Sequence, residues 1–164
     1  MEVGVKKSGS SYVSFSTKMC WDAVIECAYA AKSINSAEQA QMKSSLKGTN
    51  FENFVPFHAP IVKSLNNLSG VPPGSFLGFF WIDGENLTLM HAMIFVGKHG
   101  GSDYMAAGNK NGCIGVGGAV GWELLDLGEL KWGGPFSFTV GNKSIQIRYR
   151  DMNGGNALSA VYGG

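Results

Sequence analysis

The stretch that decides the fold runs from Ser75 to Gly97 and reads SFLGFFWIDGENLTLMHAMIFVG. Two apolar runs, Ser75–Ile82 and Leu87–Val96, flank Asp83-Gly84, a dipeptide typical of tight turns between strands. Both runs are far shorter than the ~20 apolar residues that a membrane-spanning helix needs. The stretch therefore predicts two antiparallel strands joined by a turn.

More strands are expected downstream. His99-Gly100-Gly101 predicts a turn into a short strand around Tyr104–Ala107, and a Gly141-Asn142 turn joins the segments Phe136–Val140 and Ser144–Arg150. In the last segment polar and apolar residues alternate, which is typical of a strand with one solvent-exposed face. The second half of the chain is therefore predicted to be an antiparallel sheet.

The first half has the apolar spacing of helices. Residues 19–33 predict one helix, and a second begins at Ser36, where Ser36-x-x-Gln39 has the form of a capping box, and ends at Gly48. A third helix is expected over Pro60–Leu68. Together these segments predict a single α+β domain over residues 1–164, with a helical N-terminal part packed on the antiparallel sheet. Residues 151–164 have the composition of a weakly ordered tail, and the order of residues 1–15 stays open.

Composition excludes several classes of function. Net charge is +1 and only 15% of residues are charged, so no basic footprint for nucleic acid is expected. The N-terminus lacks the apolar core of a signal peptide, and no segment predicts a membrane span. Three cysteines do not suit a disulfide framework, and their spacing with the three histidines does not suit a metal site. We expect neither a metal nor another cofactor.

Cys20 is the candidate nucleophile because it lies where the first predicted helix begins. Unpaired backbone N–H groups and the helix dipole stabilise a thiolate there, and the same groups can hold an oxyanion. The alternative is ordinary burial, since cysteine is among the most buried residue types. Cys27, two turns further along, is predicted to be core, and Cys113, in a glycine-rich loop, is a minor rival nucleophile.

His91 is the candidate base. It opens the apolar run that continues to Val96, so it faces either solvent or a site at the end of the sheet. A partly buried structural histidine is the alternative. His99 is expected to be solvated, and His58 is ambiguous.

These residues, taken in order, resemble a known family. Pro73-Gly74-Ser75 leads into a strand and a turn, His91 opens the next strand, and that strand ends at Gly97. With a cysteine at the start of an upstream helix, the pattern is similar to that of NlpC-type and CHAP-type amidases, which have a papain-like fold. The Cys20-Trp21 pair is also similar to the Cys-Trp pair of papain-type proteases and transglutaminases. The resemblance covers roughly residues 16–110 and implies a catalytic cysteine and histidine.

The resemblance also implies a third, polar residue that orients the histidine from the strand after it. The matching strand position here falls at Ala106, which cannot do this. Asn109, just past the end of that strand, is the best substitute, because its amide oxygen can accept a hydrogen bond from imidazole. Asp103 is the runner-up, and Asn111 follows it.

Two further features remain open. The glycines at 112, 115, 117 and 118 lack the strand, helix and Lys-Ser/Thr context of a phosphate loop, so we interpret them as a loop near the site or a structural loop. Trp81, Trp122 and Trp132 either line a substrate groove or, for at least two of them, pack in the core.

The function that the resemblance implies is a cysteine peptidase or amidase. Its substrate would be a protein, a peptidoglycan stem peptide or a glutamine side chain. Small single-domain members of this type imply an antibacterial or host-directed bacterial effector toxin, made in the cytoplasm and delivered into a target cell by a specialised secretion system. If the toxin is antibacterial, an immunity protein is expected as its partner. The alternative is a non-catalytic binding or structural domain in which Cys20 and His91 only pack.

Overall fold

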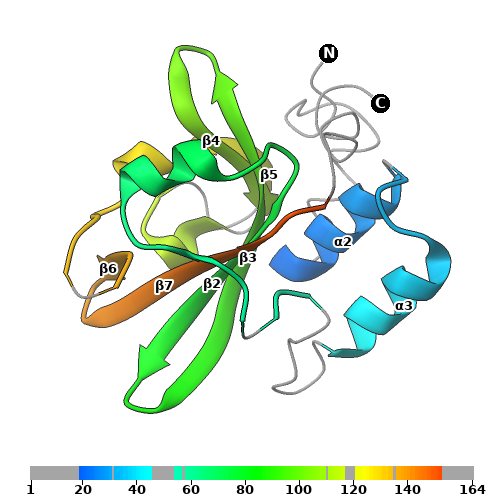
Figure 1. The fold of residues 1–164 in the computed structure, drawn as a ribbon, viewed down its shortest axis with the longest axis horizontal. Helices are drawn as coiled ribbons and strands as arrows, with labels where there is room; N and C mark the ends of the chain where they lie inside the picture. The colour runs from blue at the N-terminus through cyan, green and yellow to red at the C-terminus, as the bar shows by residue number, and fades with distance from the viewer. Residues whose placement is uncertain are drawn as a thin grey trace.

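The computed structural model describes residues 19–30, 32–45, 54–56, 58–109, 111–116, 121–134 and 136–152. The predicted tail after residue 152 and the segment before residue 19 lie outside the described residues, as does the end of the second helix near Gly48. Within this part of the chain two α-helices lie on one side of an antiparallel sheet (Figure 1). The α+β prediction is therefore confirmed.

Among the described residues the sheet has seven strands, and all of their pairings are antiparallel. Its order is β1-β7-β2-β3-β4-β5, with β6 paired to β7. The strands are β1 (Ile61–Val62), β2 (Phe76–Asp83), β3 (Asn86–His99), β4 (Ser102–Asn109), β5 (Trp122–Asp126), β6 (Phe138–Val140) and β7 (Lys143–Arg150). The Ser75–Gly97 stretch thus forms the central hairpin of the sheet, as predicted, while β5 was not predicted.

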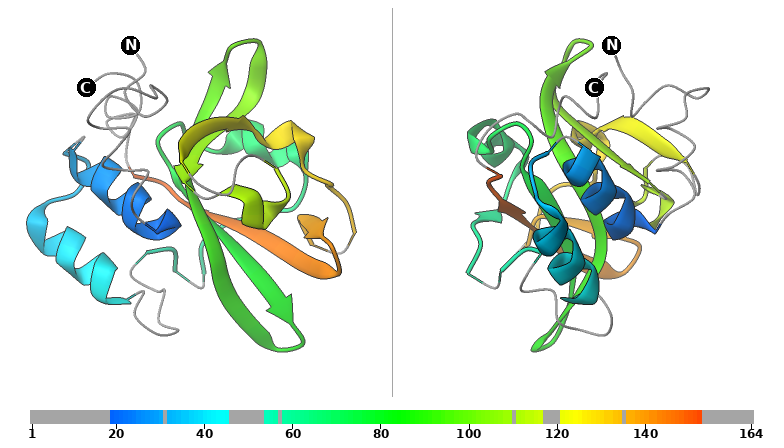
Figure 2. Two further views of the ribbon diagram at one scale, coloured as in Figure 1. Left: turned by 180° about the vertical axis from the view of Figure 1, so that it is seen from behind. Right: turned by 90° about the vertical axis from the view of Figure 1, so that its right-hand side faces the viewer.

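Both faces of the sheet are covered (Figure 2). Side chains alternate along β3, so Ala92 and Ile94 belong to the core beneath the helices, whereas Met93 and Phe95 belong to a second core on the opposite face. His91 has the same parity as Met93, and its ring lies 5.4 Å from the ring of Phe79 in that second core. The imidazole of His91 therefore packs against Phe79 of this second core.

The helices are α2 (Cys20–Ala30) and α3 (Ser36–Ser45). Helix α3 begins at Ser36 as predicted, but its capping box is one residue earlier. Asn35 Oδ1 accepts from the backbone N–H of Glu38 at 2.8 Å, and Glu38 Oε1 accepts from the N–H of Asn35 at 3.1 Å. Asparagine is at least as good an N-cap as serine, and the carboxylate is a strong acceptor for the returning bond. Gln39, predicted to close the box, instead donates to Glu26 of α2 at 3.0 Å.

The third predicted helix, over Pro60–Leu68, is wrong. Ile61–Val62 forms β1 against Arg148 and Ile147 of β7, and a 3-10 helix, η1 (Leu65–Gly70), follows. Asn67 Oδ1 accepts from the backbone N–H of Lys63 at 3.2 Å, a local bond that favours a turn over a longer helix. Two more 3-10 segments, η2 (Asn111–Ile114) and η3 (Leu127–Glu129), flank β5.

Candidate active site

The candidate site lies where β3 and β4 separate. The recorded β3–β4 pairing ends at Ile94↔Ala107, while β4 continues to Asn109 in pairing with β5. The N-terminal end of α2, dark blue in Figure 1, meets the sheet in this region. At residues 90–92 the edge of β3 that faces β4 is therefore not paired with a strand. Helix α2 and the 3-10 helix η2 contact β3.

Cys20 is the first residue of α2 and is only 5% exposed. The backbone N–H of Ala92, the residue after His91, interacts with its thiol and lowers the thiol pKa, as do the N–H groups of Trp21 and Cys20 itself. Burial opposes these effects and is the larger, so the pKa of Cys20 rises to about 11. The sequence-based expectation of a thiolate stabilised by the helix N-terminus is not met, because desolvation outweighs the helix amides.

His91 is fully buried, and its two ring nitrogens have different surroundings. Nε2 lies 2.9 Å from Asn111 Oδ1, and Nδ1 has no hydrogen-bond partner among the described residues. Burial lowers the pKa of His91 to about 4, while the bond to Asn111 opposes the decrease. The imidazole is therefore neutral at neutral pH, and an amide oxygen can only accept, so the proton resides on Nε2 and the lone pair on Nδ1.

Asn111 is tied by its side chain to the end of β4. Its Nδ2 donates to the carbonyl of Gly108 at 3.0 Å. A Cβ atom at position 108 would lie 2.8 Å from both Asn111 Oδ1 and Met93 Cγ, so glycine leaves the space that the amide occupies. Gly108 and Asn111 thus form one local unit that presents an amide oxygen to the imidazole.

The three candidates for the third residue have separate places. Asn111, ranked third from the sequence, makes the hydrogen bond to His91. Asn109 is buried at the end of β4, paired across the ladder with Trp122. Asp103 is exposed at the other end of the β3–β4 hairpin, about 20 Å along the strand from His91, given ~3.3 Å per residue.

The other predicted residues lie in different surroundings. Cys27 is fully buried in the core beneath the helices, as expected, and burial raises its pKa. Cys113 is exposed on η2, with Sγ 4.0 Å from the carbonyl oxygen of Met90 and close enough to Cys20 to raise the Cys20 pKa further. Although the residue is exposed, partial desolvation of its thiol raises the Cys113 pKa, and the charge of Lys143 opposes this increase. Cys113 therefore lies beside Met90, the residue before His91, and stays the rival candidate for the nucleophile.

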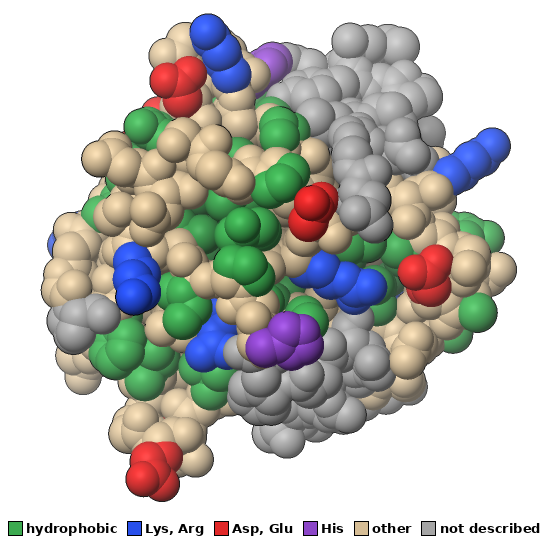
Figure 3. All heavy atoms as spheres, viewed as in Figure 1, with side chains coloured by type: hydrophobic (Ala, Val, Ile, Leu, Met, Phe, Trp, Pro, Cys, Tyr) green, Lys and Arg blue, Asp and Glu red, His purple; other side chains and the backbone are tan. Residues whose placement is uncertain are grey.

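His58 and His99 lie away from this region. His99 is the last residue of β3, and acidic, basic and histidine side chains gather over that hairpin tip in Figure 3. His58 is exposed and lines a hollow of about 280 Å³ with Pro56, Tyr149 and Arg150.

Among the tryptophans, Trp122 is fully buried in the core, whereas Trp81 and Trp132 are half-buried in the second core. Lys143 lies 4.7 Å above the ring of Trp81. Trp132 donates its ring N–H to the carbonyl of Leu127 at 2.7 Å. Trp122 therefore packs in the core beneath the helices, and Trp81 and Trp132 pack against the second core.

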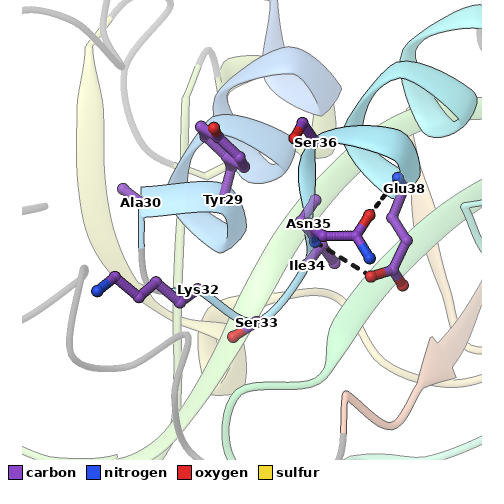
Figure 4. A pocket seen from close by; sticks show the side chains of 8 residues that line it. All are labelled: Tyr29, Ala30, Lys32, Ser33, Ile34, Asn35, Ser36 and Glu38. Carbon is purple, nitrogen blue, oxygen red and sulfur yellow. Dashed lines mark hydrogen bonds between the residues drawn. The ribbon is translucent and has the colours of Figure 1, made fainter.

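A hollow of about 710 Å³ lies at the turn between α2 and α3 (Figure 4). Tyr29, Lys32 and Ser33 line it, together with the Asn35–Glu38 capping box. It lies at the C-terminal end of α2, about 15 Å along the helix from Cys20 at 1.5 Å per residue. It is therefore separate from the thiol and the imidazole.

In the described ranges no three His, Cys, Asp or Glu side chains cluster as a metal would require. Neither helix described is long and apolar enough to span a membrane. Comparisons of the chain with protein-family models, with curated proteins and with solved structures find no match in any of the three.

Proposed function

We propose that this protein is a cysteine-dependent amide-bond hydrolase with a papain-like arrangement, in which Cys20 is the nucleophile, His91 the base and Asn111 the residue that orients His91. The observation that carries the proposal is the environment of His91. Its Nε2 is bound by Asn111 Oδ1, its Nδ1 lone pair has no partner among the described residues, and the residue after it interacts with the Cys20 thiol. A buried ring nitrogen without a hydrogen bond is uncommon in folded proteins, and a general base needs an available lone pair.

The protonation states favour general-base catalysis over a stored ion pair. With a raised Cys20 pKa and a lowered His91 pKa, the resting groups are a thiol and a neutral imidazole. As the sulfur attacks the amide carbonyl carbon, the thiol proton passes to His91 Nδ1. The oxyanion is stabilised by backbone N–H groups at the start of α2.

The second half of the reaction reverses the proton transfer. The imidazolium donates its Nδ1 proton to the leaving amine, and the C–N bond breaks to leave a thioester on Cys20. A water molecule then gives a proton to Nδ1 and its oxygen attacks the thioester carbon. As the C–S bond breaks, the imidazolium returns that proton to the Cys20 sulfur, which releases the acid and restores the thiol and the neutral imidazole. Asn111 keeps its oxygen on Nε2–H throughout and stabilises the imidazolium in each step.

The substrate class follows from the resemblance rather than from the site. A protein backbone, a peptidoglycan stem peptide and a glutamine side chain all offer the required amide. A role as a delivered bacterial effector with an immunity protein stays a prediction of the same resemblance. Digestion of purified peptidoglycan and of a cell lysate, followed by mass spectrometry, tests the proposal. New amine and carboxyl ends, or a +1 Da change at glutamine, support it, and unchanged peptides in both contradict it.

The burial of both Cys20 and His91 favours the competing function, a non-catalytic domain in which the two residues pack. That function predicts no turnover and no dependence of Cys20 reactivity on His91. Iodoacetamide labelling of the wild type and of His91→Gln separates the two proposals. Slower labelling of Cys20 in the variant, with its melting temperature unchanged, supports the hydrolase.

A further inference from the structure

Glu123 lies behind Asn111, on the side away from His91. It is the second residue of β5 and pairs with Gly108 across the β4–β5 ladder. Its Oε1 lies 3.4 Å from Asn111 Nδ2, the nitrogen that also donates to the Gly108 carbonyl. The Asn111 amide therefore uses both N–H groups on acceptors and its oxygen on His91.

This arrangement fixes which way the Asn111 amide faces. Rotating it by 180° would bring Oδ1 against the Gly108 carbonyl and the Glu123 carboxylate, where an oxygen meets only acceptors. It would also bring Nδ2, a donor, against His91 Nε2. The imidazole would then have to carry its proton on Nδ1, and the base atom would be lost. The acceptors behind Asn111 therefore determine the tautomer of the imidazole in front of it.

We propose that Glu123 is a positioning residue for His91, acting through Asn111: its carboxylate holds the amide so that Oδ1 faces Nε2–H and the Nδ1 lone pair is available as base. The use of Nδ1 as a catalytic base rests on the proposed function. The position of the proton on Nε2 follows from the hydrogen bond to Asn111 alone. The carboxylate charge also favours the imidazolium that forms transiently, because the polarised amide lies between the two groups.

The experiment compares Glu123→Ala, Glu123→Gln and Glu129→Ala in ¹⁵N-histidine-labelled protein. Glu129 is an exposed carboxylate on η3 and is the matched control. The His91 resonances, assigned by their loss in His91→Gln, report which ring nitrogen is protonated. Wild type and Glu129→Ala should show one tautomer, with the proton on Nε2. Glu123→Ala should show a mixture of both, and Glu123→Gln should restore the single tautomer, because its amide oxygen still accepts.

A second readout is the iodoacetamide labelling of Cys20 at pH 7. Loss of the Nδ1 base should slow labelling by about 10-fold or more in Glu123→Ala, the size expected when an outer hydrogen-bond partner is removed, and by less than about 3-fold in Glu123→Gln. A single unchanged tautomer and unchanged labelling in Glu123→Ala would overturn the proposal.

If Glu123→Ala does not melt cooperatively, Glu123→Met, of similar shape but without an acceptor, takes its place with the same expectation. Failure of both variants to fold also overturns the proposal, since Glu123 would then be a structural residue. Failure of the proposed function looks different: a tautomer mixture in Glu123→Ala, together with a wild type that hydrolyses neither peptidoglycan nor lysate proteins, leaves the positioning role intact and rejects the hydrolase.

Discussion

In His91→Gln, where no base assists the thiol, alkylation of Cys20 should accelerate about 900-fold between pH 7 and pH 10, whereas proton transfer to His91 at pH 7 keeps the increase smaller in the wild type. The structure raises the Cys20 pKa to about 11, so the thiolate fraction rises from about 10⁻⁴ to about 10⁻¹ over this range. An exposed cysteine with a pKa near 8.5 would accelerate only about 30-fold and level off above pH 9. A stored thiolate–imidazolium pair would react at nearly the same rate throughout.

The assay uses heavy and light iodoacetamide with peptide mapping, which follows each cysteine separately. Cys27 is the internal control, because it is fully buried and should label only as the protein unfolds. Cys113 is measured in the same digest, so its exposed thiol does not contribute to the Cys20 rate. A flat profile for Cys20 would contradict a raised pKa, because the helix amides would then outweigh burial.

Three more predictions address the histidine and the turn that holds it. Lowering the pH from 6.5 to 4 should reduce the free energy of unfolding by up to about 3 kcal/mol. The reason is that His91 has a pKa of about 4 in the folded protein and stays neutral there, but takes up a proton when the protein unfolds. Urea titrations should show this pH dependence in the wild type and lose it in His91→Gln. Gly108→Ala should destabilise the protein by about 1–3 kcal/mol, since its Cβ would overlap the Asn111 amide, whereas Gly70→Ala, with nothing within 4 Å, should melt as wild type does. Asn111→Ala should lower turnover by about 10–100-fold through loss of its bond to His91, and a greater loss in Asn109→Ala would restore Asn109 as the third residue.

The central hairpin could be predicted from the sequence because two apolar runs and an Asp-Gly turn are local signals. Strand β5 could not, because its five residues, Trp122–Asp126, show no clear alternation and depend on pairing with β4. The helix over Pro60–Leu68 failed for a similar reason, since Ile61 and Val62 are fixed by a partner strand almost ninety positions later.

In the candidate site, too, local features could be predicted from the sequence, whereas features that depend on tertiary contacts could not. Cys20 and His91 could be proposed from the sequence because Cys20 begins a helix and His91 opens the apolar run within β3. The choice among Asn109 and Asn111 depends on how the chain turns after β4, which the Gly-Asn-Lys-Asn sequence does not specify. The raised pKa of Cys20 was missed because burial is a property of the assembled fold, whereas the helix N-terminus is visible in the sequence. Glu123 gave no signal, since it meets Asn111 only across a strand pairing.

The most direct measurement is the turnover of Cys20→Ala beside Cys113→Ala in the peptidoglycan and lysate digests, with melting temperatures for both. The Cys20 thiol lies beside Ala92 of β3 and the Cys113 thiol beside Met90, so the pair of variants separates the nucleophile from its neighbour. We expect Cys20→Ala to fold and to release no product, and Cys113→Ala to retain most of the wild-type turnover. Product release by folded Cys20→Ala, or its loss in Cys113→Ala alone, would contradict the assignment of Cys20 as the nucleophile.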